Sequence, residues 1–415
     1  MEYSLARTTA QRCPRWPRAR RATASSPELR LYEFTVATGK TRELLTPAQL
    51  LQGIEEQLAP EEKARRERMR QSLRGFTAFE ISPDGSFLLI PLSGKLYMVN
   101  RQTSQVTELT PAGESGEAGQ GGGEPAIDPQ LSPDGKLVAY VRGRDLFVMD
   151  LRTRKERRLL HSQNPFVSYG LAEFVAQEEL HRFSGFFFAP DSQSIAFTEV
   201  DNRPVETLYL ADALRPEVPP QPMRYPRAGT DNALVRLGVV PVQGGTPQWI
   251  DWAHDKFPYL ATVVWQEGGP LLLTVLSRNQ HDAELLSADV KSGQTQRLHA
   301  EHSDGWINID QDVPRVLKDG SGFLWSSEQS GDRELELRDL NGTLLRVLVP
   351  RGEGLRKLVD VDPQNGVVTY LASREPSEQY LYRVPLLGGA AVRLTAERGY
   401  HMASFGKGHS VYVLQ

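Results

Sequence analysis

A short turn motif recurs along this chain and constrains its fold more than any other feature. Three clear copies are ISPDGSFLLI from Ile81, LSPDGKLVAY from Leu131 and FAPDSQSIAF from Phe188. Proline fixes its own φ and glycine supplies a positive φ, so Pro-Asp-Gly between two β-rich runs predicts a hairpin. Weaker copies begin at Trp252, Val316, Val361 and Phe405. The chain is therefore built from an internal repeat of roughly 44 to 64 residues.

A second hairpin follows the first in most copies. Its plan is an apolar strand, a polar turn and a strand that closes on leucine, as in LYMVNRQTSQVTELT and LFVMDLRTRKERRLL. An earlier segment, LYEFTVATGKTRELL from Leu31, has the same plan but no Pro-Asp-Gly turn before it. Two hairpins make a four-stranded unit, and such units bury their faces by packing radially. We predict an all-β fold, a β-propeller of about eight four-stranded blades over residues 31–415, with the first blade incomplete.

Composition narrows the class of partner. The net charge of -4 argues against nucleic acid or an anionic membrane as the main partner, and no apolar run approaches the roughly 18 residues of a membrane span. The single cysteine excludes an intrachain disulfide. Residues 1–30 begin with an arginine-rich stretch that lacks an apolar segment, so we expect a disordered basic tail there. Compartment and oligomeric state stay open.

Two insertions interrupt the repeat. We expect residues 46–75 to be helical, because Thr46-Pro47 is a helix start and APEEKARRERMRQSLRG runs from acidic to basic. A solvated, charged helix face is the simple interpretation of that run. The second insertion, residues 170–185, contains Glu178 and Glu179 shortly before three phenylalanines. Two adjacent carboxylates beside an apolar run are costly unless both are solvated or share a cationic partner.

The order of several segments resembles the N-terminal propeller of the dipeptidyl peptidase IV branch of the prolyl oligopeptidase family, bacterial type. The segments are VATGKTRELL, EEKARRERMR, EFVAQEELHRFSGFFFAPDS, RYPRAGTDNALVRLGVV, GWINID and WSSEQSGDRELELRDLNG. The resemblance spans roughly residues 31–415. It implies that Glu178 and Glu179 hold the free α-amino group of a peptide substrate.

The resemblance also implies a role for the basic insertion. In the family, an arginine from this helix reaches the carbonyl or carboxyl side of the substrate. The candidates here are Arg66 and Arg70, which would share a helix face at a spacing of four residues. The spacing does not choose between them, and Arg65 or Arg68 remains an alternative.

The implied function is substrate recognition in a serine-type dipeptidyl peptidase, whose intact members release N-terminal X-Pro or X-Ala dipeptides. They cut with a Ser-Asp-His triad on an α/β-hydrolase domain, which needs a G-x-S-x-G motif. This chain has none, since GESGE at Gly113 ends in Glu117. We therefore expect a truncated or split member, inactive alone, that pairs with a separate hydrolase domain. The alternative is a non-enzymatic propeller that serves as a protein-interaction scaffold.

No cofactor or metal is expected. His299 and His302 lie three residues apart but lack a carboxylate at a ligand spacing on a helix, so surface-loop histidines are the better interpretation.

Overall fold

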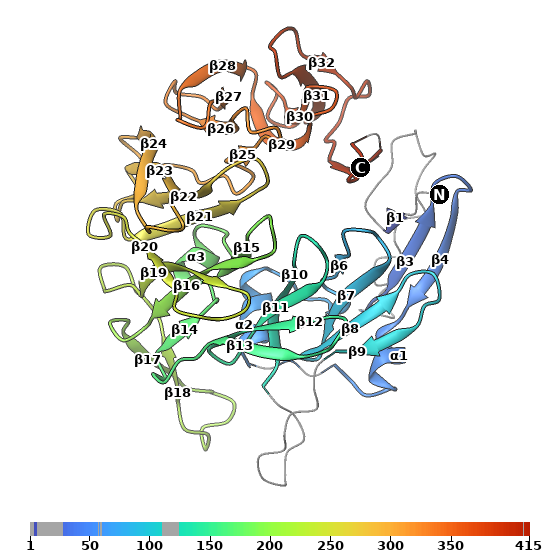
Figure 1. Cartoon of the computed structure of the whole chain (residues 1–415), viewed down its shortest axis with the longest axis vertical. Coiled ribbons are helices and arrows are strands. Elements are labelled where there is room, and N and C mark those ends of the chain that lie inside the picture. The colour runs from blue at the N-terminus through green and yellow to red at the C-terminus, as the bar shows by residue number, and fades with distance from the viewer. Residues whose placement is uncertain (1–3, 6–27, 57, 59, 110–123, 410) are drawn as a thin grey trace.

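The computed structural model describes residues 4–5, 28–56, 58, 60–109, 124–409 and 411–415 (Figure 1). Most of the predicted basic tail lies outside these residues. In the described part of the chain, eight antiparallel sheets follow one another around a ring, which makes the fold a β-propeller. The repeat read from the sequence therefore identified the architecture correctly.

The sheets follow chain order. The first contains β1 (Ser4–Leu5), β3 (Leu31–Thr35) and β4 (Lys40–Leu45). The second contains β6 (Glu80–Ile81), β7 (Phe87–Leu92), β8 (Lys95–Asn100) and β9 (Val106–Glu108). The third contains β10 (Ala126–Leu131), β11 (Leu137–Arg142), β12 (Asp145–Asp150) and β13 (Glu156–Leu160). The fourth has five strands, β14 (Val167–Tyr169), β15 (Phe186–Phe188), β16 (Ser194–Asp201), β19 (Leu234–Pro241) and β20 (Gln248–Ile250).

The remaining sheets repeat the plan. The fifth contains β21 (Tyr259–Trp265), β22 (Leu271–Leu276), β23 (Asp282–Ala288) and β24 (Thr295–His302). The sixth contains β25 (Arg315–Val316), β26 (Phe323–Ser327), β27 (Glu334–Arg338) and β28 (Leu344–Val349). The seventh contains β29 (Leu355–Asp362), β30 (Val367–Ala372), β31 (Tyr380–Pro385) and β32 (Val392–Arg393). The eighth contains β33 (Ala403–Phe405) and β34 (Tyr412–Leu414).

Two smaller sheets lie outside this plan. Strand β2 (Glu28–Leu29) pairs in parallel with β5 (Arg74–Gly75). Strands β17 (Thr207–Leu210) and β18 (Gln221–Arg224) form a hairpin that projects from the ring (Figure 1).

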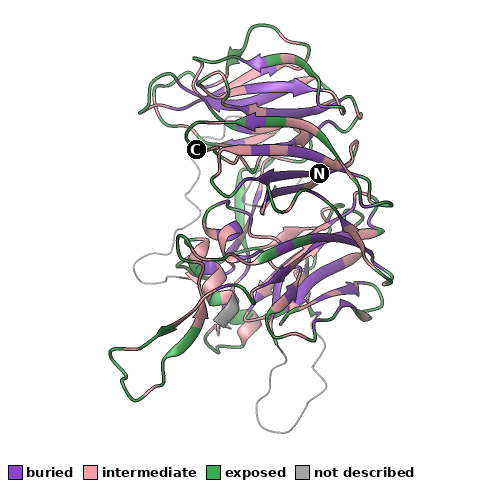
Figure 2. Cartoon of the chain, turned by 90° about the vertical axis from the view of Figure 1, so that its left-hand side faces the viewer, coloured by how far each residue is buried: buried purple, intermediate pink, exposed green. Residues whose placement is uncertain are grey.

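Five of the six hydrophobic clusters in the described part of the chain join neighbouring sheets, as radial packing requires. Leu89 of β7 packs with Val138 and Tyr140 of β11, and all three are at most 1% exposed. The three phenylalanines of β15 alternate: Phe186 and Phe188 are buried in one cluster, whereas Phe187 packs against the next. Strand β15 is therefore apolar on both faces, and Figure 2 shows that buried residues run along many strands of the ring.

One copy of the repeat was placed wrongly in the sequence analysis. The segment from Trp252 was expected to be a hairpin turn inside a blade, but residues 251–258 connect β20 of the fourth sheet to β21 of the fifth. Proline and glycine are missing from its His254-Asp255-Lys256 turn. Nothing in the backbone chemistry therefore forces a tight hairpin at that point.

Three short helices lie in the connections between strands. Helix α1 (Pro47–Leu51) and helix α2 (Pro60–Arg68) lie between β4 and β6, and helix α3 (Phe174–Glu178) lies between β14 and β15. The first connection leads from the first sheet to the second, whereas the second interrupts the fourth sheet, because β14 and β15 both pair with β16. The two connections nevertheless meet, since Nη1 of Arg68 in α2 lies 3.1 Å from Oε1 of Gln177 in α3. The fold thus places the basic insertion and the Glu-Glu insertion on one face.

Candidate functional site

Helix α3 is anchored by a buried ion pair at its start. Glu173, which precedes the first helical residue, accepts a hydrogen bond from Nη2 of Arg182 at 2.9 Å, and both side chains are at most 5% exposed. Arg182 also donates to the carbonyl oxygens of Leu260 at 3.1 Å and Ser184 at 2.9 Å. A buried guanidinium needs this set of acceptors. Sequence analysis did not single out this third glutamate, which is structural.

The inner side of α3 is apolar. Val175 and Leu180 pack against a cluster that contains Tyr259 and Ala261 of β21 and Ile307 of the loop after β24. Ala176 and Gln177 are buried as well. The helix therefore cannot rotate without exposing apolar surface, which fixes the direction of its remaining side chains.

The two predicted carboxylates lie at the end of this helix. Glu178 is its last residue and its side chain is 23% exposed, whereas Glu179 is the C-cap and is exposed. The backbone N–H of Glu179 donates to the carbonyl of Val175 at 2.9 Å. Two acidic side chains thus stand on a fixed helical turn, one half-buried and one in solvent.

The C-terminal end of α2 docks on α3. Arg68 donates through Nη1 to Oε1 of Gln177 at 3.1 Å, and its guanidinium lies 5.0 Å from the ring centre of Phe174. Burial lowers the pKa of Arg68 from its usual value, while the charges of Glu178 and Glu67 oppose that shift. On its other edge Phe174 meets Tyr225 of the RYPRAG segment, with ring centres 4.9 Å apart. The basic helix is therefore held against the Glu-Glu helix through Arg68.

Of the two predicted arginines, Arg70 reaches one of the carboxylates, that of Glu178. Its Nη2 lies 3.5 Å from Oε2 of Glu178, and its side chain is 79% exposed. Such a long, solvated ion pair is weak.

Arg66 lies elsewhere. It is 5% exposed and forms ion pairs with Glu56 and Glu62, each at 2.9 Å. The predicted shared helix face fails because α2 ends at Arg68 and Arg70 takes a left-handed φ of 56°. A spacing of four residues aligns side chains only within a continuous helix.

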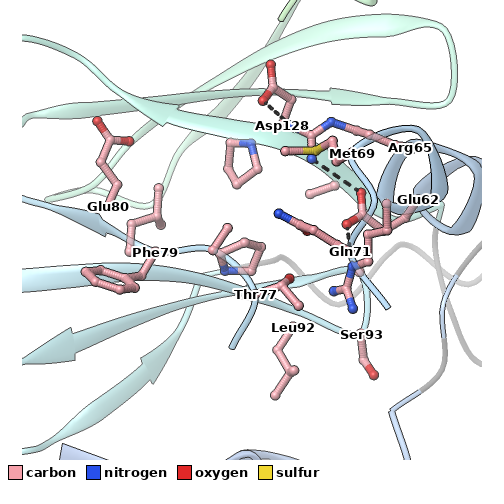
Figure 3. Close-up of a pocket in the computed structure, with 17 residues that line it drawn as sticks. Glu62, Arg65, Met69, Gln71, Thr77, Phe79, Glu80, Leu92, Ser93 and Asp128 are labelled. Atoms are coloured by element: carbon pink, nitrogen blue, oxygen red, sulfur yellow. Dashed lines mark hydrogen bonds and ion pairs between the residues drawn. The ribbon is translucent and has the colours of Figure 1, made fainter. Parts of the chain in front are cut away.

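The alternative Arg65 also faces away from α3. Its Nη2 donates to Oδ1 of Asp128 in β10 at 2.8 Å, and its Nη1 lies 3.8 Å from Glu62. Arg65 and Arg66 line a cavity of about 270 Å³ between α2 and strands β6, β7 and β10 (Figure 3). Other residues on its wall are Met69, Gln71, Phe79 and Glu80. This cavity does not include the Glu-Glu pair.

Two further questions concern metals and membranes. Within the described residues, no group of three or more His, Cys, Asp or Glu side chains is placed to hold a metal ion. Across the same part of the chain, no helix is long and apolar enough to cross a membrane.

Comparison with known proteins agrees with this fold. The family model for the dipeptidyl peptidase IV N-terminal region matches residues 82–415. A probable dipeptidyl-aminopeptidase B of Emericella nidulans is 26% identical over 312 residues, which is 67% of this chain and 34% of that protein. Dipeptidyl peptidase 8 of Mus musculus is 26% identical over 334 residues, covering 66% of this chain and 37% of that protein.

A solved structure is similar over nearly the whole chain. The crystal structure of Porphyromonas gingivalis dipeptidyl peptidase 4 superimposes with a TM-score of 0.72 at 20% identity, covering 93% of this chain and 53% of that one. The chain spans about a third of the length of the curated relatives it matches. From the family match over most of its length, the chain belongs to the dipeptidyl peptidase IV N-terminal region family.

Proposed function

We propose that this chain is the substrate-recognition propeller of a dipeptidyl peptidase and binds the free N-terminus of a peptide through Glu178 and Glu179. The observation that carries the proposal is the end of α3. There, two adjacent carboxylates stand on a rigid turn, and the ion pair between Glu178 and the exposed Arg70 is a long contact.

The chemistry of a primary ammonium suits this arrangement. It has three N–H donors, and two carboxylates can accept them through charge-assisted hydrogen bonds. A peptide ammonium would replace the solvated guanidinium of Arg70 at Glu178. Because the Arg70 pair is weak, little is lost in the exchange.

Once the ammonium has displaced Arg70 from Glu178, Arg70 is free to bind another part of the peptide. Arg70 lies at the end of α2, which Arg68 and Gln177 hold against α3. A guanidinium can donate two parallel hydrogen bonds to a carbonyl or carboxylate oxygen. We therefore assign Arg70, rather than Arg66, to the carbonyl side of the peptide.

The reaction itself is a proposal drawn from the relatives. The matched proteins are named dipeptidyl peptidases or dipeptidyl-aminopeptidases and are longer than this chain. Release of an N-terminal X-Pro or X-Ala dipeptide would require an α/β-hydrolase domain as the partner of this propeller. That domain would supply the serine nucleophile and its base.

Charge-neutral variants test the assignment of the two glutamates. Glu178→Gln and Glu179→Gln should each weaken binding of a peptide that begins Ala-Pro by about 10- to 100-fold, because each removes charged hydrogen bonds. Glu217→Gln, an exposed residue in the β17–β18 hairpin, is the matched control and should bind as the wild type does. Calorimetric titration of the purified chain measures all three. Wild-type affinity in both site variants would refute the proposal and favour the scaffold alternative.

A further inference from the structure

Asp128 occupies an unusual backbone position in β10. The pairing of β10 with β11 shifts register between Ile127 and Gln130, so Asp128 lies at a bulge. Its φ is 51°, in the left-handed region. Aspartate and asparagine enter that region more readily than other residues with a side chain. Bulges re-aim side chains out of the regular strand pattern, and this one turns the Asp128 carboxylate toward α2.

Both oxygens of this carboxylate are used. Oδ1 accepts the 2.8 Å hydrogen bond from Arg65 of α2 (Figure 3). Oδ2 accepts from Oγ of Ser184 and from Nε2 of Gln130, the latter at 3.1 Å. The side chains of Asp128 and Arg65 are 14% and 18% exposed. The ion pair is therefore largely shielded from solvent and is stronger than a surface pair.

The two partners belong to the two insertions that form the candidate site. Arg65 is in α2, the helix that leads to Arg68 and Arg70. Ser184 follows α3, and its carbonyl accepts from Arg182, which in turn pairs with Glu173 at the start of α3. One carboxylate on the propeller thus connects both insertions, through Arg65 and Ser184, which are more than 100 residues apart in the chain.

We infer that Asp128 is a positioning residue: its charge fixes α2 against the propeller and so places Arg70 beside Glu178. Arg65 has a second acidic neighbour in Glu62, at 3.8 Å, but that residue is on α2 itself and cannot anchor the helix to the propeller. The anchoring of α2 by Asp128 is independent of the proposed function, whereas the part of α2 in peptide binding rests on it.

The substitution Asp128→Asn tests the inference with little disturbance of the strand. Asparagine tolerates the left-handed φ and keeps an acceptor for Ser184, but it loses the charge that holds Arg65. Hydrogen–deuterium exchange of the segment 62–71 should become faster by about tenfold or more, the effect of losing a charged hydrogen bond. Exchange in β11 and β16 should stay unchanged. The control is Asp134→Asn, in the turn between β10 and β11, where the carboxylate bonds Ser132 and the backbone N–H of Lys136.

A second pair of variants keeps the test decisive if Asp128→Asn folds poorly. Arg65→Gln should loosen the segment 62–71 as Asp128→Asn does, and the double variant should loosen it no further, because both remove the same interaction. Arg65→Lys keeps the charge and should restore most of the protection.

Peptide binding gives the readout that a purely structural role would not move. Asp128→Asn should weaken affinity for a free Ala-Pro peptide while keeping its preference over the N-acetylated form, since Glu178 and Glu179 are intact. Exchange of the segment 62–71 within twofold of the wild type would overturn the inference, as would loosening of α2 without loss of affinity. If the wild type binds neither peptide, the proposed function fails, and the exchange experiment still decides whether Asp128 anchors α2.

Discussion

At the scale of single residues, the Asp84 carboxylate shows how the recurrent turn is held. Its Oδ1 accepts hydrogen bonds from Oγ of Ser82 at 2.6 Å and from the backbone N–H of Ser86 at 3.0 Å. Gly85 follows with a φ of 73°. The hydrogen bond from Ser82, followed by those from Ser86, lowers the pKa of Asp84 to about 2. The repeat motif is conspicuous in the sequence because each of its residues has a separate role in this turn.

This lowered pKa predicts a pH dependence of stability. The stabilising charge is fully present above the unfolded pKa of about 3.9 and is lost as the pH falls toward 2. Asp84→Asn should reduce the free energy of unfolding at pH 7 by no more than about 1 kcal/mol, since the turn is solvated, and should flatten its dependence between pH 4 and pH 2. Urea unfolding across that range measures the effect, with the exposed Asp231→Asn as control. An unaltered pH slope in Asp84→Asn would contradict the assignment.

Breaking the buried ion pair of Glu173 and Arg182 should reduce the free energy of unfolding more than the Asp84 substitution does. Glu173→Gln leaves the Arg182 guanidinium without its charge partner in a site that is at most 5% exposed. We expect Glu173→Gln to reduce the free energy of unfolding by about 3 kcal/mol. The double variant Glu173→Gln/Arg182→Met should lose less, because it leaves no buried charge. Chemical denaturation of the single and double variants checks the order. A single variant as stable as the wild type would show that the pair does not anchor α3.

At the scale of elements, α2 and the turn that follows it divide their arginines between two tasks. Arg66 is nearly buried between Glu56 and Glu62, whereas Arg70 is 79% exposed beside Glu178. Arg66→Met should destabilise the insertion and lower the melting temperature. Arg70→Met should change the free energy of unfolding by less than about 0.5 kcal/mol and weaken only peptide binding. Thermal unfolding together with peptide titration separates the two effects, and the reverse pattern would restore Arg66 as the substrate-binding arginine.

The same helix shows where prediction from sequence reached its limit. The start signal and charge gradient predicted a helical insertion over residues 46–75, of which the structure makes two short helices, α1 and α2, and the strand β5. Helix α2 ends at Arg68, which separates Arg66 from Arg70. No proline or glycine directly follows Arg68 to indicate this helix end in the sequence. The docking of Arg68 on Gln177 joins residues 109 apart, and such contacts follow from blade packing rather than from local pattern. Phe174 and Asp128 were missed for the same reason.

At the scale of the whole molecule, the repeat was sufficient to predict the propeller. Radial packing needs only apolar strands at a regular period, and Leu89, Val138 and Tyr140 show the result at one boundary between sheets. The period did not fix each turn, as the connection at residues 251–258 shows, because a copy with no proline or glycine in its turn carries no conformational constraint there. The propeller brings onto one face two insertions that sequence order keeps apart.

The central claim, that this face binds a peptide through its free N-terminus, is tested most directly with two peptides that differ in one group. Calorimetric titration of the purified chain with an Ala-Pro peptide and with its N-acetylated form compares an ammonium with a neutral amide at the same position. We expect the free peptide to bind at least about 100-fold more tightly, because acetylation removes the charge and two of the three N–H donors. Equal affinity for the two peptides would contradict the account.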